Sequence, residues 1–311
     1  MTTDAPRASS ARATRAGEAS LEIAVTGVAG AVVARDGGAD RVELCSALEL
    51  GGVTPSQGLT EAAVATGVPV HALVRCRPGG FVYDADELDV MIREIRTLVR
   101  SGVAGVVVGA LRADGTLDVD AVRWFVEAAR DATAALPTRP HEPRPLEQRP
   151  LEPRPLDITV HRAVDRAADP VAAVAALAGL GVTRVLTSGG ASTVGAGLAS
   201  GVLPRMVAAS GDVQVMAGGG VQLGDMSALV AARVDAVHLS AKRAVATRAS
   251  SAAVSAVSLG EQASSDTWFE TDPGLVRAAR HALDRHTLDR HELDRHAPDR
   301  PTRDRPTPDR H

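Results

Sequence analysis

Acidic, basic and imidazole side chains recur inside or directly after the short apolar runs of this sequence. The candidates for one acid–base or substrate-binding site are Glu22, Glu43, Arg75, His161, Arg162 and Asp165. A carboxylate among apolar neighbours is costly to bury unless a cation compensates it, so we expect the two glutamates to pair with the two arginines. Such a group would form either a structural ion-pair network or a site that binds an anion and transfers a proton.

A second group of small residues, together with one histidine, is a candidate anion-binding site. Its members are Ser188, Gly189, Gly190, Gly218, Gly219, Gly220 and His238. Glycine lets the backbone approach a ligand closely, and backbone N–H groups can hold a phosphate or a carboxylate. Tight turns also require glycine, so this prediction depends on a fold that brings the residues together.

Short β-rich runs alternate with helix-like stretches along the part of the chain that carries these residues. Eight runs are expected to be strands, at 21–25, 40–45, 69–74, 104–109, 157–161, 183–187, 212–217 and 235–239. Helical stretches are expected at 84–102, 118–135, 169–179 and 223–232. This alternation indicates a parallel sheet that is covered by helices.

Eight strand–helix units predict a single (β/α)8 TIM barrel, a fold of about 250 residues. The alternative is a doubly wound sheet, which needs a glycine-rich fingerprint that Gly27 and Gly30 match poorly. In a barrel, catalytic residues gather at the C-terminal ends of the strands and in the loops that follow. The candidate residues occupy such positions, so we expect them to meet at one mouth of the barrel.

Three segments do not fit the barrel pattern. We expect a disordered N-terminal segment (1–20), a barrel domain (21–280) with a disordered Pro/Arg-rich insert (137–156) before its fifth strand, and a low-complexity His/Asp/Arg tail (281–311). The tail repeats every five residues, or about 500° on a helix, so its leucines form no stripe and it extends the last helix only briefly. For the same reason its histidines do not stack into a metal site: His281, His286, His291 and His296.

Composition excludes several classes of function. The net charge is −4 and only 2% of residues are aromatic, which argues against nucleic-acid and polybasic membrane binding. No run of about 18 apolar residues indicates a membrane span, and no signal peptide is recognised. Two cysteines, Cys45 and Cys76, are too few for a disulfide scaffold, so we expect a reducing, cytoplasmic compartment. The pattern leaves a homo-oligomer open.

Several stretches together resemble the CutC copper-homeostasis protein family. They are LEIAVTGVAGAVVARDGGADRVELCSALELGGVTPS, FVYDADEL, GVVVGALRADGTLD, TVHRAVD, RVLTSGGA and VMAGGGV. The resemblance spans about 21–260 and implies a TIM barrel, a cytoplasmic role in copper handling and copper binding. The family's motif glutamates, arginines, histidine and aspartate correspond to the six acid–base candidates.

The sequence departs from the Cu(I) site that the resemblance implies. Family members with such a site have cysteines at the positions of Ala24 and Cys45, where two thiolates on neighbouring strands would suit Cu(I). Ala24 breaks that pair, and Cys76, which could supply a second thiolate, stands where the family usually has proline. Three more positions differ from the family's loops: Pro78, Gly80 and Ala217.

Two functions follow, and the sequence leaves open whether the protein is an enzyme. The first is a copper-homeostasis protein that binds copper through Cys45, with or without Cys76. The second is a barrel enzyme for a small anionic or phosphorylated metabolite. In it Glu22 or Glu43 is the general base, His161 is the acid or proton shuttle, and Arg75 and Arg162 bind the anion.

Overall fold

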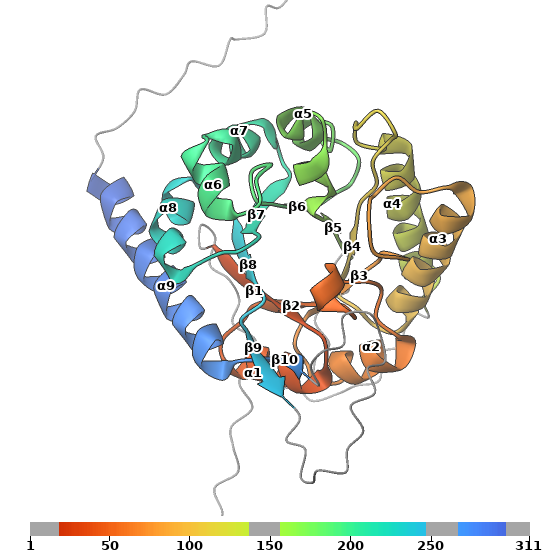
Figure 1. Cartoon of the computed structure of the whole chain (residues 1–311), viewed down its shortest axis with the longest axis horizontal. Coiled ribbons are helices and arrows are strands. Elements are labelled where there is room, and N and C mark those ends of the chain that lie inside the picture. Colours follow the sequence, from red (N-terminus) through yellow and green to blue (C-terminus); the bar gives the residue numbers. More distant parts are fainter. Residues whose placement is uncertain (1–18, 137–155, 247–266, 297–311) are drawn as a thin grey trace, which may run out of the picture.

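A computed structural model of the chain describes residues 19–136, 156–246 and 267–296, and eight of its strands close into a parallel barrel (Figure 1). The barrel strands are β1 (Ser20–Val25), β2 (Arg41–Leu44), β3 (Val70–Leu73), β4 (Gly105–Val108), β5 (Asp157–Val160), β6 (Arg184–Thr187), β7 (Gln214–Gly218) and β8 (Ala236–Leu239). They pair in sequence order, and β8 closes the barrel against β1, with Glu22 opposite His238. The predicted (β/α)8 barrel is confirmed.

Helices surround the barrel and shield its strands from solvent (Figure 1). They are α1 (Val28–Asp36), α2 (Gln57–Val64), α3 (Ala85–Arg100), α4 (Val119–Ala134), α5 (Pro170–Ala175), α6 (Val194–Ala199), α7 (Val202–Ala209), α8 (Met226–Ala231) and α9 (Pro273–His296). Helix α3 shows how the sequence sets such a helix: Asp84 and Glu87 form a capping box at its start, and its apolar face buries Met91 and Ile95. No helix of the described residues is long and apolar enough to cross a membrane.

Side chains alternate along each strand, so that one set faces the helices and the other faces the barrel interior. On β1, Leu21, Ile23 and Val25 belong to the main apolar core, and burying each contributes about 1.5–3 kcal/mol. The intervening Glu22 is fully buried and faces inward. Most barrel interiors are filled by branched apolar residues. This one holds many buried polar groups, including Glu22, Arg41, Glu43, His71, Thr159, His161 and Arg184.

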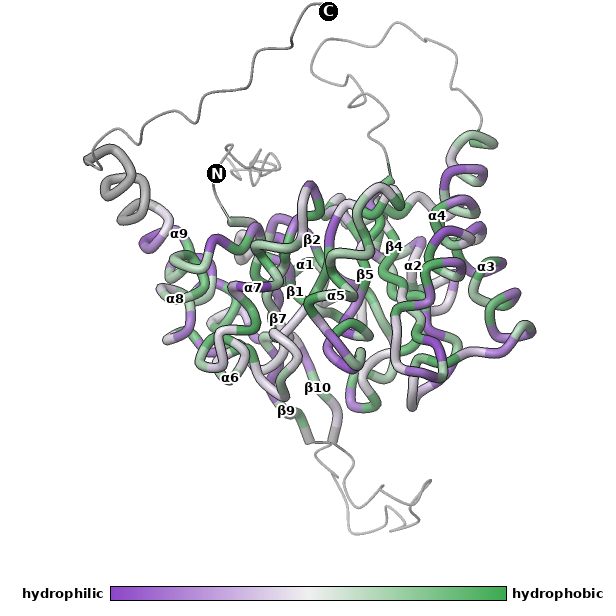
Figure 2. Tube along the Cα trace, turned by 90° about the horizontal axis from the view of Figure 1, so that it is seen from above, coloured by the Kyte–Doolittle hydropathy of each residue, from purple (hydrophilic) through white to green (hydrophobic). Residues whose placement is uncertain are grey.

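A two-stranded antiparallel ribbon follows the barrel strands, which the sequence pattern did not predict. It consists of β9 (Lys242–Ala246) and β10 (Thr267–Thr271), and β9 begins three residues after β8 ends. Figure 2 shows the ribbon projecting from one end of the barrel. Because β9 continues from the C-terminal end of β8, the ribbon stands beside the mouth where chemistry is expected.

Helix α9 continues further into the five-residue repeat than we expected and ends at His296. The buried residues Val276, Ala279, Leu283 and Thr287 follow helical spacing, so the stripe is completed by residues that precede the repeat. The expected segments 1–20 and 137–156, and the tail after His296, lie outside the described residues except at their edges.

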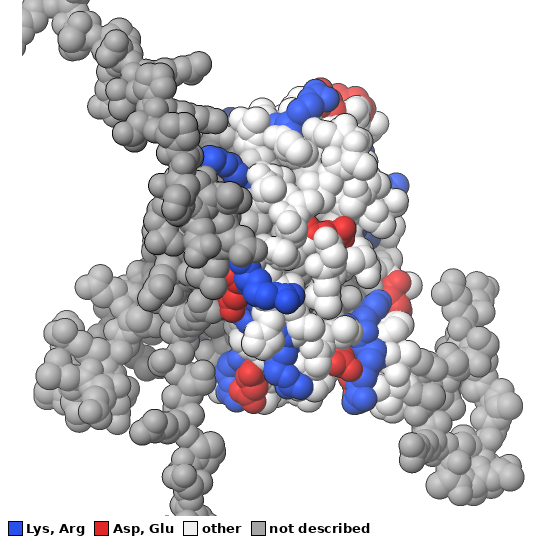
Figure 3. All heavy atoms as spheres, turned by 90° about the vertical axis from the view of Figure 1, so that its left-hand side faces the viewer, with Lys and Arg blue, Asp and Glu red and all other residues white. Residues whose placement is uncertain are grey.

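Figure 3 shows the face of the molecule that lies on the left in Figure 1, and charges of both signs are interspersed on it. Arg and Lys side chains lie next to Asp and Glu side chains, with wide uncharged surface between these groups. A nucleic-acid interface needs a continuous basic patch or stripe. The described part of this face offers none.

Candidate active site

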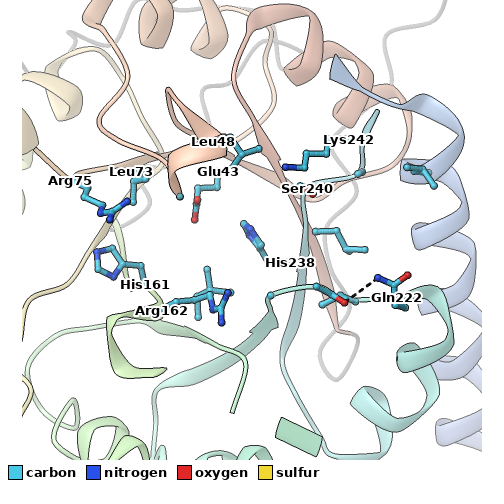
Figure 4. A pocket seen from close by; sticks show the side chains of 18 of the residues that line it. Glu43, Leu48, Leu73, Arg75, His161, Arg162, Gln222, His238, Ser240 and Lys242 are labelled. Carbon is cyan, nitrogen blue, oxygen red and sulfur yellow. Dashed lines mark hydrogen bonds between the residues drawn. The ribbon is translucent and has the colours of Figure 1, made fainter. Parts of the chain in front are cut away.

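A cavity of about 450 Å³ opens at the C-terminal ends of the barrel strands, where the sequence placed the site. Four of the six acid–base candidates line it, namely Glu43, Arg75, His161 and Arg162, and so do three of the seven anion-binding candidates, namely Gly219, Gly220 and His238. Figure 4 shows Glu43 and His238 in the middle of the residues that line the cavity, with Arg75 and His161 on one side.

Glu22 lies beneath the cavity and connects it to a buried cation. Its Oε2 is 2.6 Å from Nε of Arg41, and its Oε1 is 2.7 Å from Nδ1 of His238. Burial alone would raise the pKa of Glu22, but the Arg41 guanidinium and the His238 ring outweigh it and hold the pKa at about 2. Glu22 is therefore ionised at every physiological pH.

The same carboxylate orients His238 and favours its charged form. Burial would lower the pKa of His238, but the hydrogen bond to Glu22 and the charges of Glu43 and Glu22 raise it above the usual value for histidine. Nδ1 is engaged by Glu22, so Nε2 is the ring nitrogen left for a ligand in the cavity. A histidine fixed by a carboxylate in this way is suited to proton transfer.

Glu43 has the opposite environment from Glu22. Only 7% of it is exposed, and its Oε2 has no hydrogen-bond partner among the described residues. Burial is the largest cause that raises the pKa of Glu43, and the neighbouring Glu22 adds to it, so the pKa lies at about 7 despite His238 and Arg41. A carboxyl group with this pKa can both accept and donate a proton near neutral pH.

His161 is a neutral imidazole at the end of β5. Burial and the nearby Arg75 guanidinium lower the pKa of His161 to about 3. Its Nδ1 accepts a hydrogen bond of 3.1 Å from the backbone N–H of Ala163, so the ring proton is on Nε2. Nε2 is buried without a partner among the described residues, and the ring packs against Phe81 at 4.8 Å. His161 thus holds one N–H donor at the wall of the cavity.

Neither arginine that we expected to compensate the glutamates does so, because Arg41 holds Glu22. Arg75 donates to the backbone carbonyls of Leu50, Gly52 and Gly79, which ties together the loops that follow β2 and β3. Those acceptors occupy both of its terminal nitrogens, so Arg75 contributes mainly positive charge and loop order.

Arg162 pairs with Asp165 in the turn after β5, at 2.8 Å from Nε to Oδ2. Asp165 is buried away from the cavity, where it also accepts hydrogen bonds from the backbone N–H groups of Ser188 and Gly190. Of the anion-binding candidates, Ser188, Gly189 and Gly190 therefore form the loop that holds Asp165, and Gly218 lies beneath His238.

The two thiols lie in separate apolar surroundings. Cys45 is fully buried with Leu73 and Val107, whereas Cys76 is half-buried against the main core. Burial raises the pKa of both thiols, most strongly that of Cys45. Ala24 is buried and offers no ligand. A pair of thiolates for Cu(I) is therefore not assembled among the described residues.

One group of nitrogen and oxygen donors could in principle hold a cation. Ligand atoms of Glu22, Glu43 and His238 lie within 4.8 Å of one another. Both oxygens of Glu22, however, already lie beside Arg41 and His238, and Arg41 supplies the compensating positive charge. We therefore interpret the group as a buried acid–base chain.

Sequence reasoning missed Arg41, His71 and Lys242. Arg41 stands two residues before Glu43, so strand alternation could have placed both on the inner face. His71 lies on the same inner face of β3 as Leu73 and approaches Asp157, at 3.9 Å. Lys242 lines the cavity because it is the first residue of β9, which begins just after the C-terminal end of β8, and a strand alternation pattern does not predict that.

Comparisons with known proteins agree on one family. The sequence model of the CutC family matches residues 19–141 and 147–243. A protein of Sinorhizobium medicae named as a family protein CutC is 43% identical over 202 residues, which are 65% of this chain and 72% of that protein. One from Agrobacterium fabrum with the same name is 40% identical over 211 residues, 68% of this chain and 74% of that protein.

A solved structure shares the fold. The crystal structure of CutC from Streptococcus agalactiae, a structural genomics target named for copper homeostasis, superposes with a TM-score of 0.57 at 24% identity. The superposition covers 71% of this chain and 98% of the Streptococcus agalactiae chain.

Proposed function

The chain belongs to the CutC family, and on this premise we propose that its barrel mouth is the active site of an enzyme that moves a proton on a small anionic metabolite. The observation that carries the proposal is a pair of buried polar atoms, Oε2 of Glu43 and Nε2 of His161, which have no partner among the described residues. Both residues line the same cavity. Buried groups left unsatisfied in this way cost free energy in the empty site, and rotation of the two side chains toward the cavity would let a substrate supply the missing partners.

The charges assign a role to each group. The Glu43 carboxylate removes a proton from a carbon next to a substrate carbonyl, and the C–H electron pair becomes the C=C bond of an enolate. The neutral His161 donates a hydrogen bond from its Nε2–H to the enolate oxygen, where the negative charge gathers. In a substrate with a C=C bond next to that carbon, protonated Glu43 returns the proton to the far end of this bond. The C=C bond shifts toward the carbonyl, which re-forms, so an isomer of the substrate results without a co-reactant. Glu22 and Arg41 fix His238, which can exchange a proton with Glu43.

Deuterium incorporation tests this proposal and does not require the substrate to be identified first. The protein is incubated in D2O with an extract of small metabolites, and mass spectrometry identifies any metabolite that gains one mass unit. We expect labelling by the wild-type protein with a rate that rises around pH 7, since Glu43 must be ionised to take the first proton. In Glu43→Gln the rate should fall by at least ~10²-fold.

Glu61→Gln is the matched control, because Glu61 is an exposed residue of α2 that does not line the cavity. It should label at the wild-type rate. No labelling by the wild-type protein, or equal labelling by Glu43→Gln, would overturn the proposal.

Copper is the other ligand that the family resemblance suggests, and it would have to be cargo at the thiols. The separate locations of Cys45 and Cys76 do not support a two-thiolate site. We therefore expect no stoichiometric binding that depends on Cys45 when Cu(I) is titrated anaerobically against a competing chelator. One copper per chain that disappears in Cys45→Ala would show that copper is bound after all.

Both cysteines are free, which supports the proposal of a reducing, cytoplasmic location.

A further inference from the structure

Three cationic side chains line the cavity, and two of them remain for a ligand once Arg75, whose terminal nitrogens donate to backbone carbonyls, is set aside. Arg162 lies on one side of His238 and Lys242 on the other, and Glu43 lies beside His238 (Figure 4). Lys242 is the only lysine of the chain, in which Lys and Arg together number 34. An ammonium group is a compact charge that can approach a single anionic oxygen, whereas arginine presents a planar fork. The two cations therefore offer separate positions for negative charge.

The Arg162 side has the features of an anion subsite. Asp165, Ser188 and Ala191 occupy its Nε and Nη2, whereas Nη1 has no acceptor among the described residues. The guanidinium packs on Gly219, where a Cβ would lie 2.7 Å from Cζ. Gly219 and Gly220 have φ of +102° and +65°, and their backbone N–H groups donate to no other described residue. Arg162 and these amides can together hold one carboxylate or phosphate.

The Lys242 side supplies a second, simpler position. Its Nζ lies 4.1 Å from the centroid of the Phe269 ring on β10, and no carboxylate among the described residues pairs with it. The ring holds the ammonium group in place by a cation–π contact and does not neutralise it. Ser240 lines the cavity next to it and adds a hydroxyl donor.

We propose that the substrate is doubly anionic, with one negative group at Arg162 and the Gly219–Gly220 backbone and the other at Lys242. The carbon atoms between the two groups would then lie over Glu43 and His238, in the middle of the cavity. The inference rests on the proposed function for what happens at those carbons, but not for the binding itself. A cavity of about 450 Å³ accommodates a small dianion of this kind.

Calorimetric titration of the full chain tests the inference with two probes of equal length. Succinate carries two carboxylates, and succinamate replaces one of them by a neutral amide. We expect succinate to bind about tenfold more tightly, and Lys242→Gln to reduce its affinity to that of succinamate while leaving succinamate unchanged. Dicarboxylates and phosphonocarboxylates with different numbers of linking carbons should show one preferred length, since the two cations are fixed.

Arg243→Gln is the matched control, because Arg243 is the next residue, is exposed, and already pairs with Glu270 at 3.3 Å. It removes the same charge and should leave the preference for succinate intact. Equal binding of succinate and succinamate, equal losses in Lys242→Gln and Arg243→Gln, or no binding of any of these probes at millimolar concentration would overturn the inference.

The two proposals can fail separately. Selective dianion binding without deuterium labelling of any metabolite would leave this inference standing and remove the proposed function. Labelling of a singly charged metabolite, without selective dianion binding, would leave the proposed function standing and remove this inference.

Discussion

Two glutamates on neighbouring strands have pKa values on opposite sides of the usual one, because Glu22 is in direct contact with both Arg41 and His238. Arg41 and His238 hold Glu22 ionised, whereas burial beside that negative charge favours the protonated form of Glu43. Environments that separate the pKa values of adjacent carboxyl groups are typical of acid–base sites. In the proposed mechanism Glu22 is therefore a positioning residue and Glu43 is the group that meets the substrate.

The shifted pKa of Glu43 predicts how stability depends on pH. Between about pH 4.5 and about pH 7, Glu43 stays protonated in the folded protein but ionises in the unfolded chain. The folded state then binds more protons, so the free energy of unfolding falls as the pH rises. Glu43→Gln removes this term. The free energy of unfolding of the variant, minus that of the wild type, should therefore rise by about 2–3 kcal/mol from about pH 5 to about pH 8, measured by urea unfolding.

Glu61→Gln again serves as the control, since Glu61 is exposed. Its unfolding free energy should follow the wild type at both pH values. A Glu43→Gln variant that runs parallel to the wild type would show that Glu43 titrates normally in the folded protein.

The elements show why part of this site could be read from the sequence and part could not. Apolar runs and helix signals predicted all eight barrel strands to within two residues at each end, and with them the mouth that collects Glu43, His161 and His238. Alternation along a strand gives the face of a residue but not its neighbour across the sheet. The pairing of Glu22 with Arg41 depends on the register between β1 and β2, which places these two residues opposite each other.

The loops after β5 and β7 fit together through a glycine, and this contact gives a prediction at the scale of elements. Gly219→Ala would place a Cβ 2.7 Å from Cζ of Arg162 and would also strain a backbone with φ of +102°. We expect a loss of about 1–2 kcal/mol in stability from the strain. We also expect weaker binding of succinate, because Arg162 must move. Thermal unfolding and calorimetry measure the two effects.

Gly67→Ala separates strain from contact. Gly67 has φ of +84°, and nothing lies within 4 Å of its Cβ position. It should lose a similar amount of stability and keep wild-type affinity for succinate. If both variants bind succinate as the wild type does, Arg162 does not contribute to the anion subsite.

At the scale of the whole molecule, helix α9 decides where the domain ends. Sequence periodicity suggested a boundary at residue 280, but α9 contacts α1, α8 and β1, and Leu283 within the first repeat is fully buried. Residues on one helix stripe can come from two different sequence patterns, which periodicity within the repeat alone does not reveal. The first repeat thus belongs to the barrel's helical layer.

Leu283→Ala tests whether the barrel and α9 unfold as one unit. Removing a fully buried leucine side chain should cost about 2–4 kcal/mol.

The chain has two tryptophans, Trp124 on α4 and Trp268 on β10, and α4 lies across the barrel from α9 (Figure 1). In a Trp268→Phe background, Trp124 fluorescence reports unfolding far from the substitution. If α9 is part of one cooperative domain, Leu283→Ala lowers the urea midpoint seen by Trp124 as much as the midpoint seen by circular dichroism. Leu275→Ala, on the same helix but 43% exposed, should change the free energy of unfolding seen by either probe by less than about 1 kcal/mol. A Trp124 transition that ignores Leu283→Ala would instead make α9 an appendage that docks on a barrel already complete without it.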